Sequence, residues 1–106
     1  MRRFLPMLVL AAVPSAALAL AAGITTVSQK GRAFTLHDVE IAHGDIVRFT
    51  NDDEFIHQVY VAAPSFGYES AEQEPGKVVD VRFPATGTFE VRCHIHPKML
   101  LTVTVR

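Results

Sequence analysis

Three side chains that bind soft metal ions lie close together near the end of the chain. Cys93, His96 and Met99 have the spacing C-x-x-H-x-x-M, which places a thiolate, an imidazole and a thioether within one short segment. Sulfur ligands of this kind select copper, or zinc where thiolates predominate. Because a structural zinc site would contain more than one thiolate, the single cysteine favours copper. Three ligands on one loop need a fourth from elsewhere in the chain.

Strand phase indicates which histidine supplies that fourth ligand. The candidates are His37, His43, His57 and His94. Apolar residues alternate with others after His57 and before Cys93, which is typical of strands with one buried face. Both residues are in phase with the buried positions, so we expect both to face the core. His94 is one residue out of phase and should point to solvent, while His37 and His43 lie in polar, turn-rich segments.

The predicted ligand set is therefore His57, Cys93 and His96, with Met99 as a weak fourth ligand. Two imidazoles and a thiolate in one plane with an axial thioether make up the blue-copper electron-transfer site. Each residue alone also has an ordinary explanation, since a lone cysteine or methionine often fills a core and a lone histidine often lies on the surface. However, a free thiol in an exported protein is a liability that metal ligation would remove.

The remaining pattern predicts an all-β domain that holds these residues. Short alternating segments are separated by Gly- and Pro-containing turns, which favours a sandwich or barrel. We expect strands at 24–29, 33–36, 39–41, 45–51, 57–62, 77–83, 87–93 and 100–105. Residues 63–75 fit no strand and are predicted to form a long loop, with a helical turn at 70–73.

The first 22 residues are predicted to be a secretory signal peptide. Two arginines at positions 2 and 3 precede an apolar run, and small residues allow cleavage after Ala19 or Ala22. The alternative is an uncleaved membrane anchor, which Pro6 and Pro14 disfavour. Residues 23–106 would then form a single domain in the periplasm.

The composition excludes several classes of protein. The chain of 106 residues has ten Lys and Arg against eleven Asp and Glu, without the basic excess of a nucleic-acid-binding protein. One cysteine cannot form an internal disulfide. Because a domain of this size buries limited apolar surface, a metal ion would be a suitable stabilising element.

The sequence resembles the cupredoxins, and most closely their short plastocyanin and amicyanin branch. The resemblance rests on four segments, in order: the G-D-x-V-x-F-x-N strand at 44–51, H-Q-V at 57–59, the turn at 84–89, and the short ligand loop at 93–99. It implies a Greek-key β-sandwich that binds one copper ion at one end through His57, Cys93, His96 and Met99.

Three positions depart from the family pattern. Gln58 replaces an asparagine that helps to tie the two ligand segments together, His94 replaces Ser or Thr, and Ile95 replaces a proline. Positions 58 and 94 should lie near each other, so these two changes could compensate.

The resemblance implies a monomeric electron carrier that shuttles single electrons between periplasmic redox proteins in transient encounters. It implies no substrate turnover, no nucleic-acid partner and no membrane association after signal cleavage. The alternative is a periplasmic copper-binding protein, a chaperone or buffer, with His94 on an exchange route. A thiol enzyme using Cys93 is disfavoured, because so short a chain leaves little room for a substrate cleft.

The resemblance also implies that His96 is the exit route for electrons. Ile95, Pro97, Met99 and Phe55 are predicted to surround it as an apolar docking patch for a redox partner. Acidic residues at 52–54, 69, 72 and 74 either attract a basic partner or simply form solvated turns.

Overall fold

A computed structural model describes residues 2–6 and 22–106 of the chain. The signal peptide predicted for residues 1–22 therefore lies, apart from residues 2–6 and 22, outside the described residues. Within these two ranges, no helix has the length and apolar character needed to cross a membrane.

Eight strands make up the described fold. They are β1 (Ile24–Gln29), β2 (Asp38–Ile41), β3 (Ile46–Asn51), β4 (Val59–Ala63), β5 (Phe66–Glu69), β6 (Val78–Arg82), β7 (Gly87–Cys93) and β8 (Leu100–Val105).

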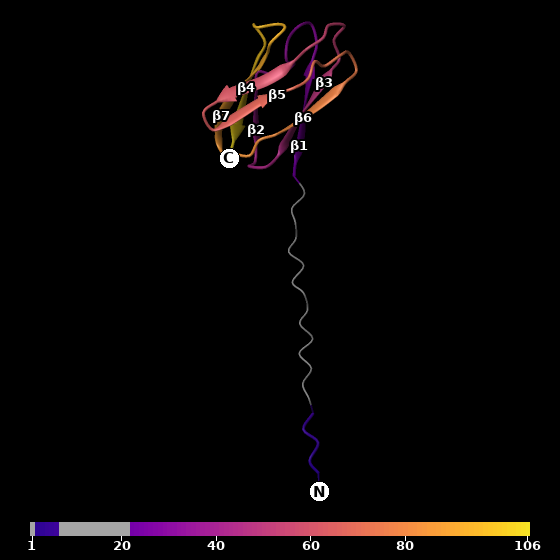
Figure 1. Ribbon diagram of the computed structural model, residues 1–106, viewed down its shortest axis with the longest axis vertical. Helices are drawn as coiled ribbons and strands as arrows, with labels where there is room; N and C mark the ends of the chain where they lie inside the picture. The colour runs from indigo at the N-terminus through magenta and orange to yellow at the C-terminus, as the bar shows by residue number, and fades with distance from the viewer. Residues whose placement is uncertain (1, 7–21) are drawn as a thin grey trace.

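The strands form two sheets that pack face to face as a Greek-key β-sandwich (Figure 1). One sheet has the order β1-β3-β6 and the other β2-β8-β7-β4-β5. β1 with β3 and β2 with β8 are parallel pairs, whereas the other pairs are antiparallel. The loop of residues 94–99, drawn in yellow-orange before β8, lies at the end of the sandwich opposite the C-terminus. The predicted all-β sandwich is confirmed.

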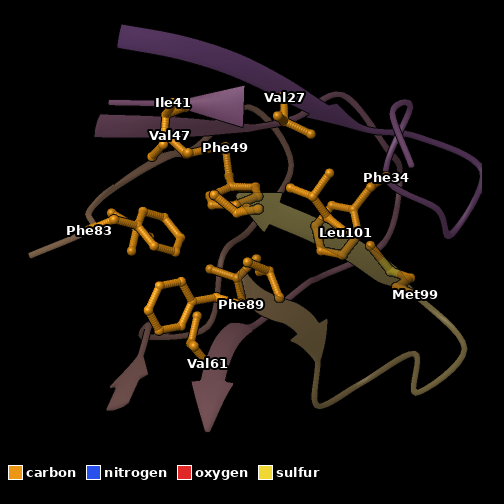
Figure 2. Close-up of a cluster of buried hydrophobic side chains, with 14 of the residues drawn as sticks. Val27, Phe34, Ile41, Val47, Phe49, Val61, Phe83, Phe89, Met99 and Leu101 are labelled. Carbon is orange, nitrogen blue, oxygen red and sulfur yellow. The ribbon is translucent and has the colours of Figure 1, made fainter. Parts of the chain in front are cut away.

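The core forms because alternate strand residues face inward. In β7, Phe89, Val91 and Cys93 are buried while their neighbours are not, which is the predicted period of two. Figure 2 shows Phe83 and Phe89 at one end of the core and Met99 near Phe34 at the other. Burial of each large apolar side chain contributes about 1.5–3 kcal/mol to the stability of this frame.

The segment 33–36 is not a strand, so this prediction is wrong. The chain reverses at Gly31 and Arg32, whose φ angles are 63° and 56°. After this tight turn, pairing is limited to an isolated bridge between Phe34 and Gln29. Two backbone hydrogen bonds flank it, from the Thr35 N–H to the Ser28 carbonyl and from the Lys30 N–H to the Ala33 carbonyl, each of 2.9 Å. The turn is thus formed, but no extended strand follows it.

The predicted loop at 63–75 is also only partly correct. It contains the edge strand β5, where half-buried Phe66 and Tyr68 alternate with exposed residues. Gly67 and the nearby Pro64 concealed this alternation in the sequence. The helical turn predicted at 70–73 is absent from the described fold, because Gln73 pairs with His57 as an isolated bridge.

A buried polar network fixes the segment that contains His57. The backbone N–H groups of His57 and Gln73 each donate to the other's carbonyl, at 3.0 and 2.7 Å. The Gln73 side chain accepts a hydrogen bond from Gln29 at 2.8 Å and donates to the Phe49 carbonyl at 3.0 Å. Asn51, at the end of β3, donates to the Gln73 carbonyl at 2.8 Å. These bonds attach the segment preceding β4 to the facing sheet.

We predict that Gln73→Leu lowers the free energy of unfolding of the apo-protein by about 1–3 kcal/mol. The substitution removes the Gln73 side-chain amide, so the buried Gln29 Nε2 loses its acceptor and the Phe49 carbonyl loses this donor. Urea unfolding of the variant and of Glu72→Leu, an exposed neighbour, would measure the effect. Equal stability of the two variants would contradict this role for Gln73.

Candidate metal centre

Strand pairing brings His57 and Cys93 to the same end of the core. In the β4–β7 pair, Val59 is opposite Cys93, and His57 lies two residues before Val59 on the same face. His57 is 0% exposed and Cys93 is 1% exposed. Both inward orientations predicted from the alternation are therefore confirmed.

The loop after β7 adds His96 to this pair. The ligand atoms of His57, Cys93 and His96 all lie within 4.8 Å of one another. The Cys93 Sγ is 3.7 Å from the His57 Nδ1, which is 3.3 Å from the His96 Nδ1. His57, Cys93 and His96 could therefore hold a single metal ion. No other group of three or more His, Cys, Asp and Glu residues converges in this way within residues 2–6 and 22–106.

Met99 lies buried beside this cluster. It is 2% exposed and belongs to the same core cluster as Cys93, and its backbone N–H donates to the His96 carbonyl at 3.0 Å. Figure 2 shows it at the end of the core, near Phe34 and Leu101. Because it is buried, Met99 is not part of an exposed docking patch, and that part of the prediction is wrong.

A carboxylate holds the buried His57 ring from behind. The His57 Nε2 lies 3.0 Å from an Asp53 Oδ2. When Nε2 carries the proton and donates a hydrogen bond to this carboxylate, Nδ1 is unprotonated and its lone pair points toward Cys93 and His96. A carboxylate partner of this kind orients a metal-binding histidine and makes it a stronger donor.

Asp53 is itself held by the neighbouring backbone. Its oxygens accept hydrogen bonds from the N–H groups of Arg32, at 2.8 Å, and Glu54, at 3.0 Å. Burial acts to raise the pKa of Asp53, but the bonds from Arg32, His57 and Glu54 outweigh it, so the pKa lies below its usual range. Asp53 therefore stays ionised at neutral pH. The sequence predicts a solvated acidic segment at 52–54, yet the Asp53 side chain is only 5% exposed. In the sequence, only the position of Asp53 four residues before His57 could have indicated this contact.

Backbone hydrogen bonds join the two ligand segments. The Gln58 N–H points at the Cys93 Sγ at 3.4 Å, and the His94 N–H donates to the Gln58 carbonyl at 3.0 Å. The Gln58 side chain donates elsewhere, to the Ser70 carbonyl at 2.9 Å. Positions 58 and 94 are neighbours, as predicted: their backbones are hydrogen-bonded directly, and their side chains meet at one Glu69 carboxylate oxygen, 3.3 Å from the Gln58 Nε2 and 3.4 Å from the His94 Nε2.

His96 combines an inward nitrogen with a partly exposed ring. Its Nδ1 faces His57, and its ring meets the edge of Phe55 with centroids 5.8 Å apart. Burial, followed by the charges of His57 and Arg32, lowers the pKa of His96, while Asp53 opposes this shift. The lowered pKa favours the neutral imidazole, which is the form that binds metals.

The other histidines lie outside the cluster. His94 has a side chain 42% exposed, stacks on Tyr60 with ring centroids 3.7 Å apart and lies 3.4 Å from a Glu69 carboxylate oxygen. Its predicted outward orientation is confirmed. His37 and His43 are both exposed.

The donor chemistry of the cluster fits copper. One thiolate and two imidazoles converge in a buried site, and a thioether lies in the same part of the core. The mixture of soft sulfur and imidazole nitrogen suits both copper oxidation states, whereas a closed zinc site would need more thiolates. The cluster could hold a single copper ion.

Comparison with known proteins finds likeness in structure rather than sequence. No protein-family model matches the chain, and no curated protein matches it in sequence. A copper-containing nitrite reductase from Thermus scotoductus has a TM-score of 0.73 at 24% identity, covering 82% of this chain and 23% of that chain. A purple cupredoxin from Nitrosopumilus maritimus has a TM-score of 0.69 at 20% identity, covering 77% and 99%.

An amicyanin variant in its reduced Cu(I) form has a TM-score of 0.73 at 21% identity, covering 83% of this chain and 87% of that chain. These likenesses show that the described residues have the cupredoxin fold. The chain spans less than a quarter of the nitrite reductase but most of the two small proteins.

We predict that Asp53→Ala lowers the copper affinity about 10- to 100-fold, because the His57 ring loses the acceptor that orients it. Competition with a chromophoric chelator would measure the affinity. The matched control is Asp52→Ala, since the exposed Asp52 accepts hydrogen bonds from Ser28 and Thr50 rather than from His57. Equal affinities of the two variants would show that Asp53 has no such role.

Proposed function

We propose that this chain is a small exported type 1 copper protein that carries single electrons between redox proteins. The observation that carries the proposal is the convergence of one buried cysteine and two histidines, one of which borders the surface. We propose His57, Cys93, His96 and Met99 as the ligands of one copper ion. Bound copper would supply the Cu(I)/Cu(II) couple. Two structurally similar proteins, the copper-containing nitrite reductase and the reduced Cu(I) amicyanin variant, contain this metal, which supports the choice.

The frame around the cluster suits a carrier because it limits movement. Cys93 ends a strand in the middle of a sheet, and His57 is held by the Gln73 bridge and by Asp53. Donor atoms fixed in this way change position little when the charge at the site changes. His96 provides the electron route, because its Nδ1 faces the cluster and its ring borders a surface hollow.

Export and turnover are further parts of the proposal. The pattern of residues 1–22 supports a signal peptide and a periplasmic location. We propose that the domain acts as a monomer in transient encounters and turns over no substrate itself. The nitrite reductase is a much longer chain, of which this domain matches only 23%.

We predict that the Cu(II) form has the intense visible absorption and narrow paramagnetic-resonance splitting of a copper–thiolate bond. Cys93→Ser should abolish this absorption, because Cys93 is the only cysteine. Met99→Leu is the matched control and should keep it. An unchanged visible spectrum in Cys93→Ser would contradict the assignment of Cys93 as a copper ligand. Rapid release of copper to a chelator together with slow electron self-exchange would instead favour a copper-delivery protein.

We also predict that Met99→Leu raises the reduction potential without loss of copper. The thioether donates electron density that stabilises Cu(II), so its removal favours Cu(I). Leucine conserves the volume of the buried side chain, which keeps the core intact. Voltammetry of both proteins would measure the shift. A lowered potential or loss of all copper would contradict the proposed role of Met99.

A further inference from the structure

The surface around His96 is apolar and hollowed. Arg32, Ile95, His96, Pro97 and Lys98 line an open hollow of about 380 Å³. Phe55, whose ring contacts His96, is 37% exposed, and Ile95 is 41% exposed. We call the five lining residues together with Phe55 the port face. Its apolar part fits the close, transient contact that electron transfer requires.

The charge of the port face is positive. Arg32 and Lys98 are the charged residues that line the hollow, and no carboxylate lines it. Within the described parts of the chain, neither residue has a carboxylate oxygen within ion-pair distance. By contrast, Arg48, Arg92 and Arg106 each pair with a carboxylate on the strands.

The nearby carboxylates do not line this hollow. Asp53 is buried and already accepts bonds from His57 and the Arg32 N–H. Asp52 is engaged by hydroxyl groups. Glu54 is exposed, but it is not among the residues that line the hollow. The three acidic residues of the segment 52–54 therefore lie outside the lining of the hollow.

The backbone holds the Arg32 charge in position. Its φ of 56° lies in the left-handed region, which residues other than glycine and asparagine rarely adopt. The bond from its N–H to Asp53 keeps it there. The guanidinium carbon lies 4.9 Å from the centroid of the Phe55 ring, which in turn contacts His96. The cation is thus one aromatic ring away from the proposed electron route.

We propose that the port face docks an acidic redox protein, whose carboxylates pair with Arg32 and Lys98 while its apolar surface covers Phe55, Ile95 and Pro97. The argument is charge complementarity, and it rests on the proposed function as an electron carrier. The sign of the charge is opposite to the one that the acidic residues in the sequence suggested. Opposite charges would speed the encounter, and salt would slow it.

The first experiment measures how fast the reduced copper-loaded protein is oxidised by two inorganic complexes of opposite charge. Hexacyanoferrate(III) is the anionic probe and tris(phenanthroline)cobalt(III) the cationic one. We expect the rate with the anion to fall as ionic strength rises and the rate with the cation to rise. Arg32→Asn, which tolerates this φ, and Lys98→Gln should each slow the reaction with the anion about fivefold and accelerate that with the cation.

Arg82→Asn is the matched control. Arg82 is exposed, has no ion pair in the described structure and lies next to Phe83, at the end of the core away from Met99. The substitution changes the net charge by the same amount as Arg32→Asn, but at the end of the core away from the port face. It should therefore leave both oxidation rates within twofold of the wild-type rates. If Arg82→Asn and Arg32→Asn have equal effects, or if salt has none, the proposal is overturned.

The second experiment tests docking of a macromolecule. Poly-L-glutamate should inhibit oxidation of the wild-type protein, and it should not inhibit the double variant Arg32→Asn/Lys98→Gln. Poly-L-lysine should inhibit neither protein. Inhibition by poly-L-lysine alone, or by neither polymer, overturns the proposal. A protein without the thiolate absorption and reversible redox chemistry would refute the proposed function itself, whereas a redox-active protein indifferent to charge refutes only this inference.

Discussion

The antiparallel pairing of β4 with β7 holds the two buried candidate ligands, His57 and Cys93, side by side. Val59 is opposite Cys93, so His57 extends past the end of the pair on the inner face. Between the ligands, the Gln58 backbone bonds to the sulfur and to the His94 N–H, which continues the pairing beyond the strands. A slip of one residue in this register would turn one ligand to the outside. The register of one strand pair thus decides whether the site exists.

Most polar groups around the cluster are satisfied by the protein itself, and the exception within the described residues is the buried Gln29 Oε1, which has no partner. His57 has Asp53 behind its ring and Gln73 on its backbone, and Asn51 supports the same segment from the other sheet. Buried polar groups need such partners, because an unpaired group costs about 1–3 kcal/mol. The cluster is therefore held by hydrogen bonds that do not involve a metal, which is consistent with a site that changes little between oxidation states.

Arg32 connects the interior of the site to its surface. Its backbone N–H bonds to the carboxylate behind His57, and its side chain lies over the ring that contacts His96. One turn residue therefore takes part both in orienting a buried ligand and in setting the charge of the exposed face. This dual contact gives a physical reason for a left-handed conformation at a position where glycine would be unstrained.

The sequence alone determined the all-β fold and the inward phase of His57 and Cys93, because alternation is a local property, and the spacing of Cys93, His96 and Met99 predicted a candidate copper site whose residues His57, Cys93 and His96 converge in the structure. Strand β5 was missed because Pro64 and Gly67 are typical of a turn and concealed the regular alternation of Phe66 and Tyr68 with exposed residues. The segment 33–36 was wrongly predicted as a strand because the turn before it supports only one isolated bridge. Only the tertiary structure placed Asp53 behind His57 and Arg32 beside Phe55. Both depend on where separate loops meet at one end of the sandwich, and a charged residue in a turn has the same local pattern whether it faces a buried ring or water.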